Sequence, residues 1–185
     1  MVHSKWSVDS IREYMTSFAG GDVGPLKIIY DRKGHETDRT LVALDKAQYD
    51  KLKRLEVNNK SSYGFSISEY VIRKSQYPKS NETTSWYLKT PTLFKMNEVE
   101  IRKQLDAFFK ELVKVEVLPD NCWEIIIPLK SRTSSEHGRY CYVNFHGAKL
   151  EQIVTAKLMI DNSSWCFEDQ QDLLSCFWRK RRQAK

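Results

Sequence analysis

The sequence of 185 residues has no long apolar run and few cysteines. No stretch approaches the roughly 18 apolar residues of a membrane span, so we expect no membrane partner. The N-terminus, Met1 to Trp6, lacks the apolar core of a cleaved secretory signal. The four cysteines form no CxxC pair, and each of them lies beside an aromatic residue. This pattern predicts reduced, buried thiols in an intracellular protein, and it disfavours a zinc site.

Motifs of common catalytic sites are also absent. The sequence contains no P-loop, GxGxxG, HExxH or GxSxG pattern. The acidic residues are scattered over predicted helix faces, and no acid–base pair stands out. We therefore expect a protein that is not an enzyme and that uses no cofactor and no metal, although an α/β sandwich does not by itself exclude catalysis.

Positive charge is in excess, and most of it lies at the C-terminal end. The chain has 30 Lys and Arg against 24 Asp and Glu, a net charge of +6. Residues 1–80 carry +4, residues 81–177 carry −3, and the last eight residues carry +5. Such a basic cluster is typical of contact with a polyanion or a nuclear import receptor, and its alternative is a solvated terminus. We expect a nuclear protein, with the cytoplasm as a second location.

The first half reads as helix, strand, strand, helix and strand. Ser7 or Asp9 can cap the first helix, and Gly20-Gly21 stops it. Apolar spacing predicts a helix over 8–18, strands over 26–30 and 40–44, a helix from Asp45 and a strand over 65–71. The polar stretch 74–84 follows and is predicted to be a linker.

The second half repeats this order with a strand in front. Asn97 caps its first helix, and the last helix places Leu173, Leu174, Phe177 and Trp178 on one apolar stripe. The other predicted elements are a helix over 150–160, a final helix over 169–181, and strands over 86–89, 113–118, 123–129, 140–145 and 165–167.

These elements predict an α+β fold of two tandem ferredoxin-like βαββαβ sandwiches with an extra C-terminal helix. The first strand of the first half is poor or missing. The predicted divisions are a domain over 1–73, a linker over 74–84, a domain over 85–168, and a C-terminal helix with a basic tail over 169–185. Helices on one face would leave the other face of each sheet open.

The segment Gly138 to Phe145 resembles the RNP1 octamer of the RNA-recognition motif (RRM) family. Five of its eight positions fit, and the basic-then-Gly order is reversed. Tyr87 lies at the aromatic position of a segment that resembles RNP2. The first half resembles a degenerate copy, because Arg39 and Leu41 occupy the two stacking positions. The last helix is similar in position to that of the extended RRM of La-related proteins.

Strand alternation places Tyr140 and Tyr142 on one face and Cys141, Val143 and Phe145 on the other. Exposed tyrosines beside a basic residue favour stacking on unpaired bases, and the alternative is that the C-terminal helix covers them. The predicted RNA-binding residues are Tyr87, Lys89, Arg139, Tyr140, Tyr142, Arg179, Lys180, Arg181 and Arg182.

We therefore predict a non-catalytic protein that binds single-stranded RNA through the second unit's sheet and the basic tail. The alternative is an adaptor whose RRM-like units bind peptides or subunits of a ribonucleoprotein complex. The first unit is predicted to contact phosphates weakly, through Lys27 and Arg39, or to serve as a protein-contact or dimer module.

Overall fold

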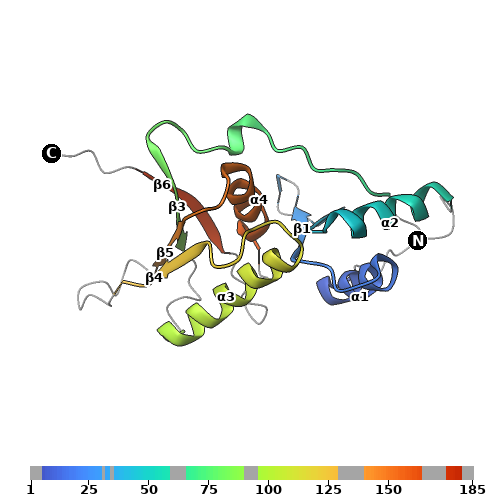
Figure 1. Ribbon diagram of the computed structural model, residues 1–185, viewed down its shortest axis with the longest axis horizontal. Helices are drawn as coiled ribbons and strands as arrows, with labels where there is room; N and C mark the ends of the chain where they lie inside the picture. The colour runs from blue at the N-terminus through green and yellow to red at the C-terminus, as the bar shows by residue number, and fades with distance from the viewer. Residues whose placement is uncertain are drawn as a thin grey trace.

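The computed structural model describes residues 6–30, 32–33, 36–58, 66–89, 96–128, 140–163 and 174–180. Within them the chain forms an α+β fold with four α-helices and two antiparallel sheets, so the α+β class is confirmed (Figure 1). The elements up to residue 76 are α1 (Val8–Ala19), β1 (Leu26–Tyr30), β2 (Glu36–Val42), α2 (Lys46–Asn58) and the 3₁₀ turn η1 (Lys74–Gln76). Those that follow are β3 (Glu82–Lys89), α3 (Glu98–Lys114), β4 (Trp123–Ile126), β5 (Tyr140–Phe145), α4 (Leu150–Ile160) and β6 (Ser175–Lys180).

The helix ends follow the local signals in the sequence. The Ser7 side chain accepts a hydrogen bond from the Ser10 amide, and α1 stops at Gly20, whose φ of 88° suits glycine. Asn97 and Glu100 form a reciprocal capping box at the start of α3, with hydrogen bonds of 2.9 and 3.0 Å. The predicted caps at Ser7 and Asn97 are therefore confirmed.

The second half forms a four-stranded antiparallel sheet in the order β4-β5-β3-β6. Its two helices, α3 and α4, lie on the side of the sheet that faces the first half (Figure 1). The core between these layers contains fully buried aromatic and aliphatic side chains, among them Trp86, Leu88, Phe108, Phe109 and Val143. No described helix lies on the other side of the sheet, which we call the open face (Figure 1).

Two predicted elements of the second half were wrong. Residues 175–180 form the strand β6, where the sequence pattern predicted a helix over 169–181. The described residues of the predicted apolar stripe therefore do not share one face: Leu174 is buried, whereas Phe177 is exposed. Residues 113–118 are not a strand either, because α3 continues to Lys114 and a turn follows it. The strand predicted over 165–167 and residue Leu173 lie outside the described residues.

The described part of the first half is not a complete βαββαβ unit. It contains two helices and the two-stranded sheet β1-β2, and residues 66–71 form no strand. Ala43 is buried in the core of the second half, and Leu41 packs against that core. Gly24 permits this close approach, because a Cβ atom there would lie 2.8 Å from Val115 Cγ2 and 2.9 Å from the Ala43 carbonyl oxygen. These residues of the first half therefore pack into the core of the second half, whereas Met15, Ala19, Val23 and Leu52 form a separate core cluster within the first half.

Lys27 binds the C-terminal end of α4, so its predicted role as a phosphate contact was wrong. Its Nζ donates a hydrogen bond of 2.8 Å to the Leu158 carbonyl and a second to the Asp161 carbonyl. Carbonyls at a helix C-terminus lack intrahelical partners and attract cations. Burial lowers the pKa of Lys27, although the nearby Asp161 opposes that shift.

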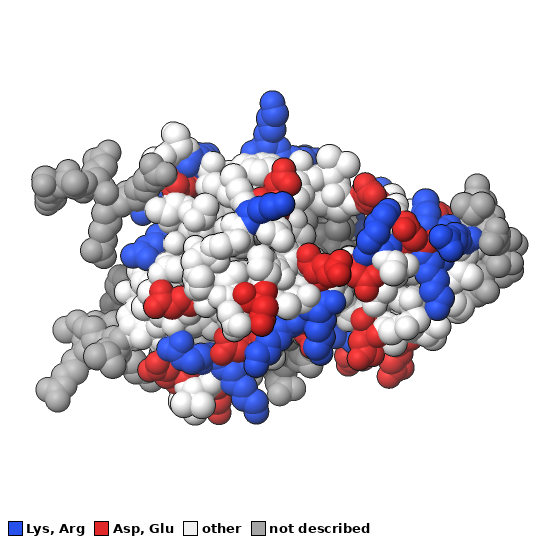
Figure 2. Space-filling model, in the orientation of Figure 1, with Lys and Arg blue, Asp and Glu red and all other residues white. Residues whose placement is uncertain are grey.

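The helix surfaces carry charges of both signs. Figure 2 shows Lys and Arg interleaved with Asp and Glu over the visible face of α2 and α3. Ion pairs join neighbouring helical turns, namely Lys46–Asp50, Lys53–Glu56, Glu98–Arg102 and Glu111–Lys114. Such i,i+3 and i,i+4 pairs offset the basic charge of the helices locally.

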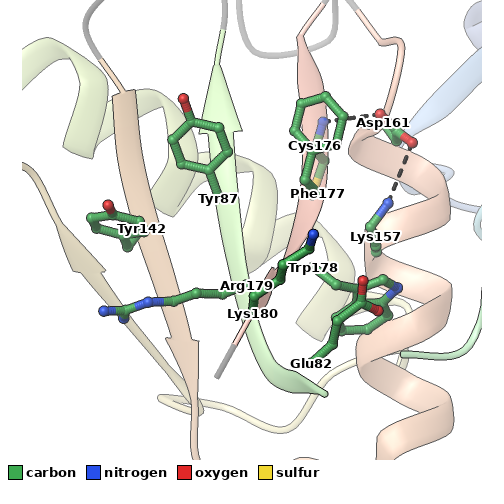
Figure 3. A pocket seen from close by; sticks show the side chains of 10 residues that line it. All are labelled: Glu82, Tyr87, Tyr142, Lys157, Asp161, Cys176, Phe177, Trp178, Arg179 and Lys180. Atoms are coloured by element: carbon green, nitrogen blue, oxygen red, sulfur yellow. Dashed lines mark hydrogen bonds and ion pairs between the residues drawn. The ribbon is translucent and has the colours of Figure 1, made fainter. Parts of the chain in front are cut away.

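Asp161 attaches the outer strand β6 to the end of α4. Its Oδ1 accepts a hydrogen bond of 2.9 Å from the Cys176 amide, and its Oδ2 lies 3.3 Å from Lys157 Nζ (Figure 3). The next residues extend this attachment, because the Asn162 amide donates to the Leu174 carbonyl at 2.7 Å. The turn after α4 thereby satisfies backbone groups that an edge strand would leave unpaired.

The Lys27 contact predicts a measurable loss of stability when its ammonium group is removed. Lys27→Met keeps the unbranched stem but leaves two helix-terminal carbonyls without their donor. We expect urea unfolding to show a decrease of about 1–3 kcal/mol in the free energy of unfolding. The matched control is Lys103→Met, at an exposed position on α3. Equal stability of the two variants would contradict the contact.

The burial of Lys27 also predicts a pH dependence. The folded-state pKa of Lys27 lies below that of the unfolded chain. Between these two values the folded protein has released a proton that the unfolded chain still binds. The free energy of unfolding of the wild type therefore rises with pH through the alkaline window just below the ordinary lysine pKa. Urea unfolding in this window should show a smaller rise for Lys27→Met, and parallel curves would exclude this linkage.

The Asp161 contact predicts different effects of two similar substitutions. Asp161→Ala removes the acceptor of the Cys176 amide and should cost about 1–3 kcal/mol of unfolding free energy. Asp161→Asn keeps an oxygen acceptor and should recover most of that loss. Amide hydrogen exchange at Cys176 provides a local readout, with protection lost in Asp161→Ala and retained in Asp161→Asn. Retained protection in both variants would show that Asp161 does not hold β6.

Candidate functional site

One row of side chains crosses the open face over all four strands. The strand register pairs Ile126 of β4 with Tyr142 of β5, Tyr142 with Tyr87 of β3, and Tyr87 with Phe177 of β6. Residues that pair directly across antiparallel strands share one face. The neighbouring row consists of Tyr140, Lys89 and Ser175. The sheet therefore carries four aromatic rings on its open face, contributed by three adjacent strands.

Strand alternation creates this surface, as the sequence predicted for β5. Cys141 and Val143 are buried on the helix-covered face, so Tyr140 and Tyr142 lie on the open face. The same period of two places Trp86 and Leu88 inward and Tyr87 outward on β3. The prediction that Tyr140 and Tyr142 share a face away from the core is confirmed.

Tyr87 is the centre of the aromatic cluster. Its ring centroid lies 5.4 Å from that of Tyr140, 5.9 Å from that of Tyr142 and 6.1 Å from that of Phe177. The rings are tilted by 34–52°, within the range of favourable aromatic pairs. Figure 3 shows Tyr142, Tyr87 and Phe177 on three neighbouring strands. We call Tyr87, Tyr140, Tyr142 and Phe177 the aromatic platform.

The Tyr87 phenol stays neutral to a higher pH than an ordinary tyrosine. Burial raises the pKa of Tyr87, and the neighbouring Tyr142 and Tyr140 raise it further. A neutral phenol keeps its O–H donor, and its ring remains available for stacking without a phenolate charge that would repel an anion.

Arg179 extends from β6 across the face to the ring of Tyr142. Its guanidinium carbon lies 4.5 Å from the Tyr142 ring centroid, a cation–π contact (Figure 3). The backbone of Arg179 is held in place because its carbonyl accepts a hydrogen bond of 3.2 Å from the Thr83 hydroxyl. Arg179 therefore belongs to the sheet face, not to a tail beyond the fold.

The platform is bordered by basic side chains. Lys89 is exposed beside Tyr140, and Lys180 is exposed at the far end of β6, on the side of that strand opposite to Arg179. None of Lys89, Arg179 and Lys180 forms an ion pair with another described residue. A shallow hollow of about 660 Å3 reaches the platform over the outer strand, lined in part by Tyr87, Tyr142, Phe177 and Arg179.

The structure brings together five of the predicted site residues: Tyr87, Lys89, Tyr140, Tyr142 and Arg179. Lys180 lies nearby on the other side of β6. Arg139, Arg181 and Arg182 lie outside the described residues. The alternative in which a helix over 169–181 covers the tyrosines fails for residues 175–180, which form a strand beside them.

Sequence reasoning missed Phe177 and Ile126, which occupy the two ends of the row. Phe177 is 51% exposed and Ile126 is 37% exposed. The signal for Phe177 was strand-like alternation, in which Leu174, Cys176 and Trp178 would face one side of a strand and Phe177 the other. For Ile126, the signal was lost in a run of three isoleucines that does not show which one points outward.

Metal ligands and apolar helices are two further features of the described residues that bear on function. No group of three or more His, Cys, Asp or Glu side chains there could hold a metal ion. No helix in the described ranges has the length and apolar character needed to span a bilayer. Cys122, Cys141 and Cys176 are buried free thiols, as predicted, and burial raises the pKa of Cys176 well above its usual range.

Comparisons with known proteins identify no family. No protein-family model matches the chain, and no curated protein matches it.

Proposed function

We propose that the protein binds single-stranded RNA on the open face of its four-stranded sheet, in a non-catalytic role. One observation carries this proposal: aromatic rings from three adjacent strands form a platform on an uncovered sheet face, with the Arg179 guanidinium upon it. Unpaired bases stack on such rings, each stack contributing about 1–3 kcal/mol. Phosphates are attracted to the cations beside it.

The arrangement of the second half supports the same proposal. Its elements follow the order β3-α3-β4-β5-α4-β6, the βαββαβ order expected from apolar spacing, although its last strand is β6 at 175–180, where a helix was expected. The aromatic residues quoted for the resemblance to the RRM family lie on the two central strands, β3 and β5. We propose an RRM-like role for this half, within a nuclear ribonucleoprotein complex.

The charge distribution at this face is compatible with RNA. The basic residues of α2 and α3 include several in ion pairs, whereas Lys89 and Arg179 pair with no described carboxylate. In the sequence, Arg181 and Arg182 directly follow β6, and Arg139 directly precedes β5. The strands β5 and β6 are thus adjacent in sequence to further basic residues. The strand β3 contains a basic residue of its own, Lys89.

An adaptor function is the second candidate, and a specific observation favours it. Ile126 and Phe177 are exposed apolar residues at opposite ends of one row, and the middle of the row is aromatic. Apolar rows with aromatic centres also bind peptides and protein subunits. The two candidates differ in salt dependence, because a peptide interface releases few condensed counterions whereas RNA binding releases many.

Tyr87→Ala tests the RNA proposal at the centre of the platform. We expect the dissociation constant of a fluorescein-labelled, sequence-randomised RNA of about 12 nucleotides to rise by about 5- to 150-fold. Tyr87→Phe keeps the ring and should stay close to the wild type. Fluorescence anisotropy, repeated between about 50 and 200 mM salt, gives both affinity and salt slope.

The matched control is Val99→Ala, because Val99 is 75% exposed on α3, away from the open face. It should leave RNA affinity unchanged. A folded Tyr87→Ala variant with wild-type affinity would refute stacking on the platform. A wild type that does not bind the RNA at all would leave the adaptor as the better candidate.

A further inference from the structure

We propose that the RNA surface extends onto the outer strand β6, where Phe177 stacks on a further base and Arg179 contacts the adjoining phosphate. This inference rests on the proposed function and assigns roles to two side chains of one strand. Phe177 and Arg179 are two residues apart on β6, so both face the same side of the sheet.

The position of Phe177 makes it a continuation of the platform. It pairs directly with Tyr87, and the two ring planes are inclined by only 34°. Its ring is half exposed, although its strand neighbours Cys176 and Leu174 are fully buried. A large aromatic ring on the open side of an edge strand gains little burial from folding. Contact with a flat, partly apolar ligand accounts for an aromatic residue at this position.

Arg179 changes which rings a base can reach. Its guanidinium lies against Tyr142, two strands away from its own backbone, a span of about 10 Å. The part of the Tyr142 ring under the guanidinium is therefore occupied. The rings of Tyr140, Tyr87 and Phe177 form the remainder of the platform, which runs from β5 through β3 to β6.

The guanidinium is also suited to a phosphate. It has five N–H donors, and it forms no ion pair with any described carboxylate. Stacking on Tyr142 holds its plane in place without using its N–H groups, so these remain directed to an anion at the rim of the stack. RNA that stacks on Tyr87 and Phe177 would bring its backbone beside this group.

The test removes the Phe177 ring at the β6 end of the row that crosses the sheet. Phe177→Ala and Phe177→Thr remove the ring, and threonine keeps high strand propensity in case alanine disturbs the edge strand. Val99→Ala, at an exposed position on α3 away from the open face, is the control. The probe is the same randomised RNA of about 12 nucleotides, and circular dichroism verifies folding.

We expect both Phe177 variants to weaken RNA binding by about 5- to 150-fold with an unchanged salt slope, and Phe177→Trp to retain wild-type affinity. Val99→Ala should change affinity by less than about two-fold. Arg179→Gln should weaken binding and lower the magnitude of the salt slope by about 0.7, the amount for one phosphate contact on a single strand. Arg179→Lys should restore the slope.

The outcomes separate this inference from the proposed function. If Tyr87→Ala weakens binding and the folded Phe177 variants do not, the RNA surface stops at β3 and the inference is wrong while the proposed function stands. If Tyr87→Ala has no effect, the proposed function itself fails. An unchanged salt slope in Arg179→Gln would refute the phosphate contact.

Discussion

Two hydrogen bonds of Asp161, at the end of α4, hold elements of both halves in place. The Asp161 carboxylate accepts a hydrogen bond from the Cys176 amide of β6, and the Asp161 carbonyl accepts one from the Lys27 side chain of β1. The first bond fixes the outer strand that carries Phe177 and Arg179. The second, together with the packing of Ala43 and Leu41 against the second half's core, holds the first half on the helix side of the sheet, and no described element of that half covers the open face. One turn thus supports the platform and keeps it accessible.

Local signals were enough to predict the elements whose ends and faces depend on nearby residues. The caps at Ser7 and Asn97 each need only a side chain three residues before its amide partner. The faces of β5 follow from alternation within six residues, since small and branched residues alternate there with two tyrosines. The central part of the candidate site, Tyr140 and Tyr142, could therefore be predicted without tertiary information.

The strand β6 could not be predicted in this way, because its apolar residues fit both the period of a helix and the period of a strand. Leu173, Leu174, Phe177 and Trp178 fit a helical stripe, while Leu174, Cys176 and Trp178 fit one face of a strand. The choice is made by pairing with β3, about 90 residues earlier in the chain, where Tyr87 lies opposite Phe177. The contact of Lys27 could not be predicted either, because it too depends on a residue far away in the sequence. Nothing near it in sequence indicates that its ammonium group meets a helix end more than 130 residues away.

The side chains on the open face also bear on the selectivity expected of the proposed RNA site. Stacking accepts every base, and phosphate contacts carry no sequence information, so the platform and Arg179 favour single strands without choosing among them. Asn144 lies on the same strand as the tyrosines and could read base edges, but its amide donates to Glu124 at 3.3 Å. RNA that competes for this amide must break that bond and approach a carboxylate. The face is therefore better suited to sequence-tolerant binding than to recognition of one base.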